Sequence, residues 1–412
     1  MTRRERTADV LVVGAGPAGL GAAAELAASG VPVEVLEREQ SAGGIPRHCH
    51  HGGFGVRRTI TINGGGLSGP EYALRCAAAA ERAGATLRTG ITVTGWAGAR
   101  TLDVTGPDGL ERITARAVLL ATGARERPRS ARLVPGSRPA GVYTTGELQQ
   151  AVHLHHQHIG TRAVVVGDEP VGHAAADTLR VAGAEVAALV TARPPQPLAV
   201  LRRGPGAPVL SRTTVTGLTG RGRLTGVTVR HEDGRTTTLR CDTVVFTGDW
   251  IPDHELARRG AVALDPGTRG PAHDASYRTG EPGVFAVGNL LHAVESAVTA
   301  AAEGRAAAAP VLRYLATGTW PTGRTALAVE APLMWIAPNL IGPDGDPPLN
   351  NRLVLRTGLR RTAPLFEVRQ DGRLLHRQRL LLPARPGVPL HLSADWLDRA
   401  DPHGGTVRIR MR

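Results

Sequence analysis

The sequence predicts an α/β protein in which a unit of parallel sheet, helices and β-meander occurs twice, followed by a small β-rich domain. Strand and helix patterns alternate from residue 9 to about 90, as in a parallel sheet covered by helices. A second strand–turn–helix pattern starts at Arg162 and is again followed by short alternating strands. From about residue 325, segments such as RLVLRTG and TVRIRMR alternate apolar and polar residues, which is typical of a half-buried sheet.

The first strand–turn–helix pattern, DVLVVGAGPAGLGAA, predicts a dinucleotide site. Gly14 permits a tight turn, Gly16 lets the backbone approach a phosphate, and Gly19 lets the helix pack on the strand. The N-terminus of the helix offers free N–H groups and the positive end of its dipole to an anion. Glu37, at the end of the next strand, would accept hydrogen bonds from ribose hydroxyls. The pattern alone does not say which dinucleotide binds.

Two later strands end in similar turns. The run AVLLATG predicts a buried strand that ends at Ala121, Thr122 and Gly123, and open α/β sheets bind ligands at such strand ends. An ordinary strand-to-loop turn is the alternative. GVFAVGN at 283–289 and the Ala-rich helical segment after it then return to the pattern of the first domain.

The second glycine motif, GDEPVG at 167–172, is degenerate. Glu169 stands where the middle glycine would be, and a carboxylate there costs both space and charge next to a pyrophosphate. Pro170 also removes a backbone donor. The next strand ends at Arg193 without an acidic acceptor for a ribose. We therefore expect a retained fold with a weakened nucleotide site, and NAD(P) binding there is doubtful.

Composition narrows the chemistry. The chain of 412 residues has room for two or three domains, and all 49 of its basic residues are arginine. Without lysine there is no Schiff-base or lysine general base, so amine or carbonyl chemistry would run on a bound cofactor. The net charge of +13 comes from scattered arginines without a nucleic-acid motif. A solvated surface, an acidic partner subunit or anionic cofactors explain this charge better than nucleic acid does.

Cysteine and histidine usage points to the cytoplasm and to no metal site. Cys49, Cys76 and Cys241 lack metal-ligand spacing and suit a reducing compartment. No signal peptide is expected at the N-terminus, and the Ala-rich stretch 297–309 is expected to be too short to span a bilayer. The HxHHxH tract at 153–158 is expected to be surface histidines rather than a metal site.

Four motifs in this order resemble the pyridine nucleotide–disulfide oxidoreductase superfamily over roughly residues 8–318: DVLVVGAGPAGLGAA, AVLLATGARERP, the second βαβ unit and TGEPGVFAVGN. The resemblance implies two interleaved Rossmann-type domains, one for FAD (1–127 and 275–324) and one that is NAD(P)-like (128–274). The β-rich domain (325–412) lies outside it. Segments 43–55, 121–149 and 288–297 are most similar to the alpha-type flavoprotein subunits of opine oxidase, hydroxyproline or proline dehydrogenase, and hydrogen cyanide synthase complexes.

The resemblance implies a set of FAD contacts. Asn289 stands where the superfamily usually has Asp, and its amide can still hydrogen-bond a ribityl hydroxyl. The helix from about Ser296 would point its N-terminus at the flavin and stabilise the reduced anion. Glu295 is either a cap-region carboxylate or a polar contact of the flavin. The full predicted set comprises Gly14, Gly16, Pro17, Ala18 and Gly19 for the pyrophosphate, Glu37 and Arg38 for the adenosine ribose, Val93 for the adenine, and Gly43, Gly44, Ala121, Thr122, Gly123, Gly288, Asn289, Glu295 and Ser296.

The loop after Gly43 and Gly44 holds the predicted catalytic residues, His48 and Cys49. Disulfide reductases of the superfamily carry a redox cysteine pair after such a Gly-Gly, but here only Cys49 remains, so a dithiol relay within this loop is excluded. Three interpretations stay open. Cys49 is a thiolate activated by neighbouring imidazolium, His48 or Cys49 lines the flavin pocket, or the loop is structural.

The sequence therefore predicts an FAD-dependent oxidoreductase that oxidises an amine, imino acid or hydroxy acid, or relays electrons from a partner subunit that does. By resemblance, its partners are a small iron–sulfur protein and another flavoprotein chain, although this chain has no four-cysteine site of its own. Two alternatives remain. One is a stand-alone NAD(P)H-dependent flavin reductase. The other is a non-catalytic FAD-holding subunit that docks partners through its C-terminal domain.

Overall fold

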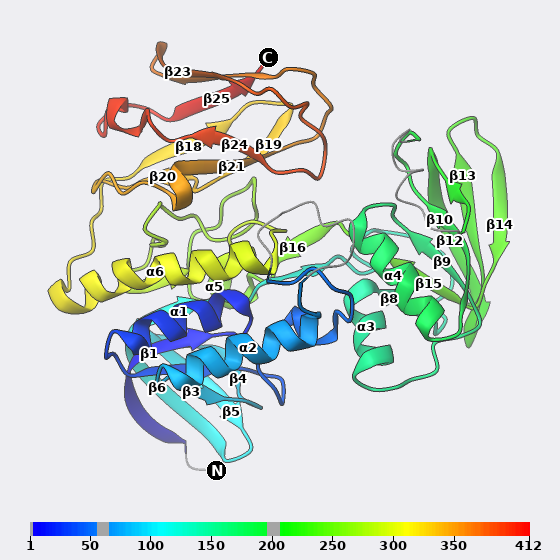
Figure 1. The fold of residues 1–412 in the computed structure, drawn as a ribbon, viewed down its shortest axis with the longest axis horizontal. Helices are drawn as coiled ribbons and strands as arrows, with labels where there is room; N and C mark the ends of the chain where they lie inside the picture. Colours follow the sequence, from blue (N-terminus) through cyan, green and yellow to red (C-terminus); the bar gives the residue numbers. More distant parts are fainter. Residues whose placement is uncertain (1–2, 56–65, 196–206) are drawn as a thin grey trace. The chain divides into compact units, whose positions relative to one another are not determined.

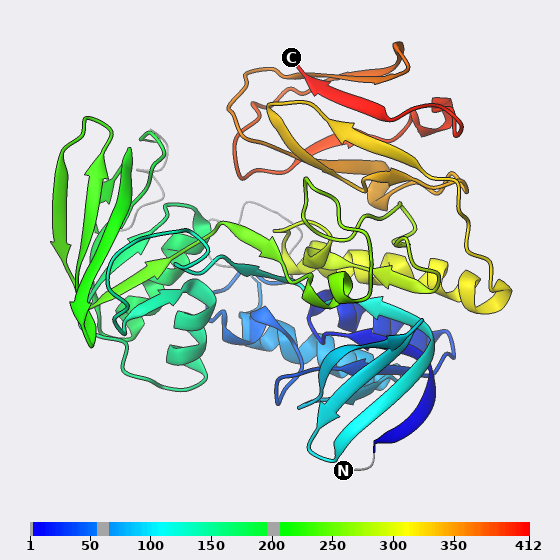
Figure 2. The same ribbon diagram turned by 180° about the vertical axis from the view of Figure 1, so that it is seen from behind.

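The computed structural model describes residues 3–55, 66–195 and 207–412, and the chain divides into two compact units (Figures 1 and 2). The first unit comprises Met1–Arg47, Gly53–Ala124 and Pro252–Arg412, and the second comprises His48–Gly52 and Arg125–Ile251. The first unit is discontinuous in sequence and includes the C-terminal strands. The predicted fold class, a duplicated α/β unit with a β-rich C-terminal domain, is observed. The domain boundaries drawn from the sequence stay a prediction.

A seven-stranded sheet forms the base of the first unit, in the order β3–β2–β1–β6–β5–β4 with β17 beside β6. Strands β1, β2, β3, β6 and β17 are parallel, whereas β4, β5 and β6 form an antiparallel meander. The apolar runs VLVV and AVLL lie fully buried in β1 and β6. The bounds are Arg4–Val13 (β1), Val33–Leu36 (β2), Thr86–Arg88 (β3), Thr92–Gly98 (β4), Thr101–Gly106 (β5), Gly109–Leu120 (β6) and Val284–Ala286 (β17).

Helix ends in this unit are set by their sequences. Ser68 and Glu71 form a capping box, in which each side chain accepts a hydrogen bond from the backbone N–H of the other. The Ser296 hydroxyl accepts from Thr299 N–H at 3.2 Å, and Gly318 ends the last helix with φ +67°. The helices are Pro17–Ala28 (α1), Gly69–Arg82 (α2), Glu255–Arg259 (α5) and Ala297–Thr317 (α6), with 3₁₀ turns at Ile45–His48 (η1) and Gly288–Leu290 (η3).

Helices α1 and α6 lie side by side (Figure 1) and approach at glycines. A Cβ atom built on Gly304 would lie 1.9 Å from the carbonyl oxygen of Ala18, and one on Gly21 would lie 2.6 Å from the carbonyl oxygen of Ala301. Alanines fill most of the remaining contact, which fits a chain with 3% aromatic residues. The first turn of α1 is thereby held against α6.

The second unit repeats the plan with a parallel sheet in the order β11–β10–β9–β15–β8 and a three-stranded meander, β12–β13–β14. Strands β7 and β16 pair where the chain leaves and re-enters the first unit. The bounds are Ala124–Glu126 (β7), Val142–Thr144 (β8), Thr145–His153 (α3), Arg162–Val166 (β9), Pro170–Val181 (α4), Glu185–Val190 (β10), Val209–Leu210 (β11), Thr213–Arg221 (β12), Arg223–His231 (β13), Thr236–Arg240 (β14), Thr243–Phe246 (β15) and Trp250–Pro252 (β16).

The C-terminal domain consists of two packed sheets, β20–β18–β25–β22–β23 and β19–β21–β24 (Figures 1 and 2). Their shared core contains Phe366 and Ile409 from one sheet, Leu353 and Leu392 from the other, and the fully buried Trp396. The bounds are Thr325–Val329 (β18), Leu333–Ala337 (β19), Leu340–Ile341 (β20), Leu349–Asn351 (η4), Arg352–Thr357 (β21), Leu365–Gln370 (β22), Arg373–Arg379 (β23), Leu390–Ser393 (β24), Leu397–Arg399 (η5) and Val407–Met411 (β25).

The α1–α6 contact makes a stability prediction. Gly304→Ala would normally favour a helix by about 1 kcal/mol, but here the added methyl group collides with the backbone of α1. We expect a net loss of about 1–3 kcal/mol, measured by urea unfolding. Gly146→Ala in α3 is the matched control, because a Cβ there meets nothing within 4 Å. A Gly304→Ala protein as stable as the wild type would contradict the close approach.

Candidate functional site

The carboxyl ends of three parallel strands meet at one edge of the first unit. The N–H of Ala121, after β6, donates to Val13 O of β1 at 2.9 Å, and the N–H of Val287, after β17, donates to Leu120 O at 3.0 Å. The glycine turn, the ATG turn and the start of the GN segment, far apart in sequence, are therefore neighbours. This is the edge at which open α/β sheets bind ligands.

The glycine turn has the shape of a phosphate cradle. Gly14 has φ +106°, and a Cβ on it would lie 2.5 Å from Ala121 O. A Cβ on Gly19 would lie 2.0 Å from Gly14 O, so neither position accepts a side chain. Gly16, the N-cap of α1, has nothing within 4 Å of its Cβ position, and no side chain caps the helix. The free N–H groups at the start of α1, with Pro17 and Ala18 in its first turn, thus face open space that suits a pyrophosphate.

Glu37 is fixed beside this cradle. It is buried, and its carboxylate accepts hydrogen bonds from the N–H groups of Ala15 and Glu39, both at 2.9 Å. Carboxylate oxygens accept more than one hydrogen bond, so ribose hydroxyls can still be bound. Arg38 next to it is exposed and pairs with Glu39 at 3.6 Å.

Val93, the predicted adenine contact, lies within strand β4 opposite Val104. Two residues earlier, the N–H of Ile91 donates to Glu37 O at 2.8 Å, so this segment of the chain reaches the end of β2. The sequence did not single out this backbone hydrogen bond between Ile91 and Glu37. The role of Val93 stays a prediction.

Two further predicted segments pack on the cradle. The N–H of Gly43 donates to Ala15 O at 2.7 Å, and a Cβ on Gly44 would lie 2.8 Å from the Cα of Gly16. A Cβ on Gly288 would lie 2.6 Å from the Cβ of Ala18. The glycines at 43, 44 and 288 therefore allow the backbone to close around the first turn of α1.

The Asn289 amide holds its own loop. Its Oδ1 accepts from Glu295 N–H at 2.7 Å, and its Nδ2 donates to Glu295 O at 3.2 Å. An aspartate could make only the first of these bonds, which gives a physical reason for the amide at this position. Asn289 therefore holds Glu295, the residue just before Ser296, which is the N-cap of α6.

The ATG turn contacts a second segment of the first unit. Thr122 Oγ1 donates to Asp253 O at 2.7 Å, and the N–H of Asp253 donates to Gly123 O at 2.9 Å. Gly123 itself has φ +77°, which favours glycine. With Ala121 bonded to β1, all three predicted ATG residues lie at the edge of the sheet that carries the cradle.

The predicted catalytic residues His48 and Cys49 belong to the second unit and are buried. The Cys49 thiol donates to Gln149 Oε1 of α3 at 3.4 Å. Burial, helped by the charge of Glu126, raises the pKa of this thiol to about 12. A thiol of that pKa is protonated at neutral pH, so the structure favours the lining or structural interpretations over an activated thiolate.

The second glycine turn is filled by a side chain of its own. Glu169 Oε1 accepts from Thr247 Oγ1 at 2.9 Å, and Oε2 accepts from Asp168 N–H at 3.2 Å. The same carboxylate lies 2.3 Å from the Cβ position of Gly248 and 2.8 Å from that of Gly167. The space that Gly16 leaves open in the first cradle is thus occupied by a carboxylate in the second.

His153 of the histidine tract stacks on His50 of the loop after Gly43 and Gly44. The rings of His50 and His153 lie 4.0 Å apart and are nearly parallel, at 7°. Burial and the neighbouring His50 lower the pKa of His153. Within residues 3–55, 66–195 and 207–412, no three His, Cys, Asp or Glu side chains are arranged to hold a metal ion. Among the helices in these ranges, none has both the length and the apolar character needed to cross a membrane.

The family model described as pyridine nucleotide-disulphide oxidoreductase matches residues 8–304. The chain belongs to this family. It is an FAD-dependent oxidoreductase, and the open turn at Gly16, the uncapped start of α1 and buried Glu37 fit the pyrophosphate and ribose of FAD. Residues 325–412 lie beyond the matched region.

Relatives of this flavoprotein are reductases and components of oxidases. It is 27% identical to a ferredoxin–NADP reductase of Ignicoccus hospitalis over 325 residues, covering 76% of this chain and 99% of that one. It is 34% identical to an opine oxidase subunit of Agrobacterium tumefaciens over 212 residues, 48% of this chain and 39% of the relative. Among solved structures, the thioredoxin reductase of T. acidophilum superposes with a TM-score of 0.61 at 25% identity, covering 75% and 98% of the two chains.

Two polar residues at structural junctions were not predicted from the sequence. Glu126 is buried and accepts hydrogen bonds from the N–H groups of Thr145 and Gly248 at 2.6 and 2.7 Å, so it joins β7 to α3 and to the end of β15. Arg356 of β21 is buried against Glu295. The conspicuous ATGARERP motif could have drawn attention to Glu126. Nothing local marks Arg356.

Gly16 offers a direct test of the cradle. Gly16→Ala places a methyl group where the pyrophosphate would lie but clashes with no protein atom. We expect FAD affinity to fall at least about tenfold, equivalent to about 1.4 kcal/mol, with the unfolding midpoint of the apoprotein unchanged. Flavin fluorescence titration measures the affinity. Gly323→Ala, also in open space, is the control. Equal FAD affinity of the Gly16→Ala and wild-type proteins would show that the glycine turn is not part of the FAD site.

Thiol reactivity tests the state of Cys49. Burial raises the pKa of Cys49 to about 12 and that of Cys241 to about 11. At pH 8 the folded protein should therefore alkylate with iodoacetamide at least about 100-fold more slowly at both residues than after unfolding in urea. Peptide mass spectrometry assigns the modified residue. Rapid labelling of Cys49 in the folded protein would restore the activated-thiolate interpretation.

Proposed function

We propose that this chain is the FAD-carrying subunit of an oxidoreductase for an amine, imino acid or hydroxy acid, and that its flavin is not reduced by NAD(P)H bound at the second glycine turn. The Glu169 carboxylate, folded into that turn, is the observation that supports this most. A dinucleotide phosphate would meet its negative charge and its volume at once.

The substrate class is supported by the relatives. The similarity to the opine oxidase subunit reaches 34% identity over 212 residues, and that to the ferredoxin–NADP reductase reaches 27% over 325 residues. This chain spans 39% of that opine oxidase relative, so the activity of the whole relative is carried over here only as a proposal. A flavoprotein partner and a small iron–sulfur partner belong to the same proposal. The three free cysteines are consistent with the cytoplasm as its compartment.

The chemistry proposed is a two-electron oxidation. FAD, when bound, supplies the acceptor for a hydride. The substrate loses that hydride from carbon and a proton from its nitrogen or oxygen, giving an imine or a carbonyl compound. The chain binds the cofactor through the cradle and Glu37, and α6 begins after the loop that starts at Gly288 against Ala18. The chain has no lysine, and the thiol of Cys49 is held protonated, so neither is the proton acceptor.

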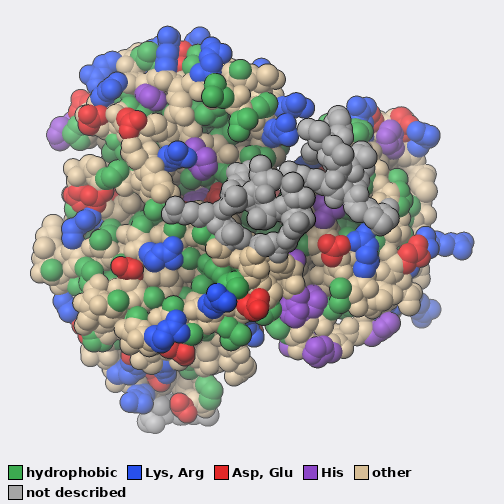
Figure 3. Space-filling model, viewed as in Figure 1, with side chains coloured by type: hydrophobic (Ala, Val, Ile, Leu, Met, Phe, Trp, Pro, Cys, Tyr) green, Lys and Arg blue, Asp and Glu red, His purple; other side chains and the backbone are tan. Residues whose placement is uncertain are grey.

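A docking role is the second candidate, and one surface favours it. Arginines gather over the C-terminal strands at the top of Figure 3. On the outer face of β22, β23 and β25, Arg369, Arg377 and Arg412 all lie within 3.9 Å of one buried carboxylate, that of Glu367. Arg410 bonds the same group. One carboxylate cannot neutralise four guanidinium groups, so this face attracts an acidic protein.

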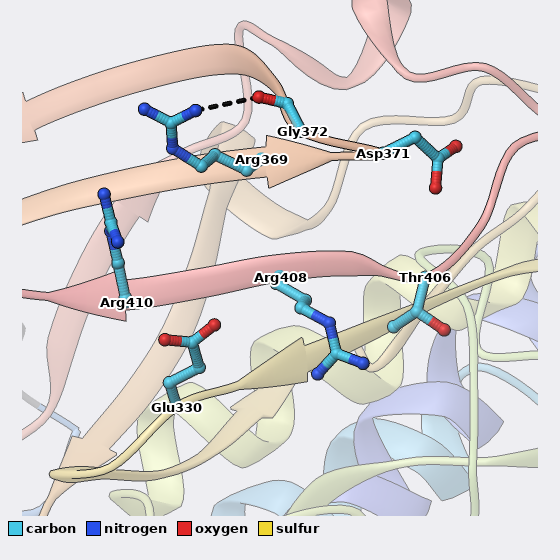
Figure 4. A pocket seen from close by; sticks show the side chains of 7 residues that line it. All are labelled: Glu330, Arg369, Asp371, Gly372, Thr406, Arg408 and Arg410. Atoms are coloured by element: carbon cyan, nitrogen blue, oxygen red, sulfur yellow. Dashed lines mark hydrogen bonds between the residues drawn. The ribbon is translucent and has the colours of Figure 1, made fainter.

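A pocket of about 330 Å³ adjoins this arginine face (Figure 4). Arg369, Arg408 and Arg410 line it, and Arg369 is oriented by a 2.8 Å hydrogen bond to Gly372 O. Glu330 and Asp371 complete its polar wall. The pocket suits an acidic side chain of a docked partner better than a redox substrate, because it belongs to the C-terminal domain alone.

Anaerobic stopped-flow spectroscopy of the purified holoprotein tests the proposal. NADH, NADPH and a panel of amines, imino acids and hydroxy acids are mixed with it, and bleaching of the flavin band is followed. The proposal expects rapid bleaching by one organic donor and slow bleaching by both nicotinamides. Reduction by dithionite alone would favour the docking role. Fast reduction by NADPH would overturn the proposal in favour of a nicotinamide-dependent reductase.

Variants of Glu169 test the electron source. Glu169→Gly opens the turn and removes the charge, whereas Glu169→Gln removes the charge and keeps the volume. We expect the rate of flavin reduction by NADPH to rise at least about tenfold in Glu169→Gly, since one lost repulsive contact of about 1.4 kcal/mol corresponds to that factor. Glu169→Gln should give a smaller rise. Equal rates in all three proteins would show that this carboxylate is not what limits nicotinamide use.

A further inference from the structure

The loop from Gly288 to Ser296, here called the GN loop, borders the FAD cradle. It starts at Gly288 against Ala18 in the first turn of α1, and it ends at Ser296, the N-cap of α6. The Tyr72 hydroxyl of α2 donates to Ala297 O at 3.3 Å, just after the loop. The GN loop therefore starts against α1, and the residue just after it is bonded to α2.

Arg356, a residue of the C-terminal domain, binds the end of this loop. Arg356 Nη2, from β21, lies 2.6 Å from Glu295 Oε1 and donates to Val294 O at 3.0 Å. The side chains of Arg356 and Glu295 are only 9% and 11% exposed. A buried ion pair of this kind is costly to break, because the partner left behind is an uncompensated charge.

The same domain also contacts the middle of the loop. The Arg356 guanidinium lies over the ring of Trp335, from β19, at 5.1 Å from its centroid. Trp335 in turn lies 5.6 Å from the ring of His292. His292 is bonded on its other side to Glu303 of α6 at 3.1 Å. Trp335 and Arg356 thus fix two separate points of the GN loop.

We propose that Arg356 is a positioning residue of the flavin site, through which the C-terminal domain fixes the GN loop and balances the charge of Glu295 beside the cofactor. The charge matters because a reduced flavin anion is disfavoured by an unpaired carboxylate nearby. This gives residues 325–412 a function in cofactor binding, although they lie outside the region that matches the family model. The proposal depends on bound FAD but not on the substrate class proposed above.

Three variants separate charge from packing. Arg356→Met removes the charge and keeps much of the length, Arg356→Lys keeps the charge but not the fork of donors, and Arg356→Met with Glu295→Gln removes both charges. Arg379→Met, on the exposed side of β23 in the same domain, is the matched control. FAD dissociation constants and flavin midpoint potentials are measured for each protein.

We expect Arg356→Met to bind FAD at least about tenfold more weakly and to favour oxidised over reduced flavin by a further factor of about ten, which is about 30 mV more negative for a two-electron couple. The double variant should recover most of the potential, and Arg356→Lys should lie between. Arg379→Met should match the wild type. If the role of Arg356 were purely structural, the double variant would not recover the midpoint potential of the flavin.

Each outcome is decisive. A folded Arg356→Met protein with wild-type affinity and potential overturns the proposal. If Arg356→Met does not fold, the two single variants Arg356→Lys and Glu295→Gln are measured in its place. Unchanged FAD affinity and unchanged flavin potential in both variants would also overturn the proposal. A wild-type protein that takes up FAD but is reduced by no organic donor contradicts only the substrate proposal, since the comparison of potentials by dithionite titration is still made.

Discussion

The close packing around Ala18 is the constraint on which the remaining structure depends. Gly304 of α6 meets its carbonyl oxygen, and Gly288 meets its side chain. The glycine turn, the loop after β17 and the longest helix among the described residues are therefore fixed against one turn of α1. Because the contacts are between backbone atoms and single methyl groups, they leave no room for compensating rotamers. The geometry of the cofactor edge follows from them.

The sequence predicted what is local. Gly14, Gly16, Gly19 and Glu37 lie within one βαβ unit, where spacing alone sets the geometry, and the structure brings them together as that spacing requires. The helix start near Ser296 and the poor fit of Glu169 to a pyrophosphate were inferred from the sequence in the same way. Each was inferred from the order of residues within one strand–turn–helix segment, although the Glu169 carboxylate makes its contact with Thr247, 78 positions later.

What could not be predicted is long-range. The pairing of Arg356 with Glu295 joins residues 61 positions apart in two different domains. The burial that protonates Cys49 comes from packing on α3, 100 positions later at Gln149. Asn289 was expected to hydrogen-bond the ribityl chain, and its two hydrogen bonds to Glu295 were missed because they depend on how an irregular loop folds. In the first two cases tertiary contact decides the chemistry of the side chain, and in the third the fold of a loop without a helix or strand pattern decides it.

The folded-in carboxylate of Glu169 has a consequence for cell physiology. If the second glycine turn is closed to nicotinamide as proposed, the tethered carboxylate competes with free dinucleotide at a high effective concentration. On the proposed function, the flavin is thereby insulated from the cellular ratio of reduced to oxidised nicotinamide. Its redox state would instead follow the supply of organic substrate.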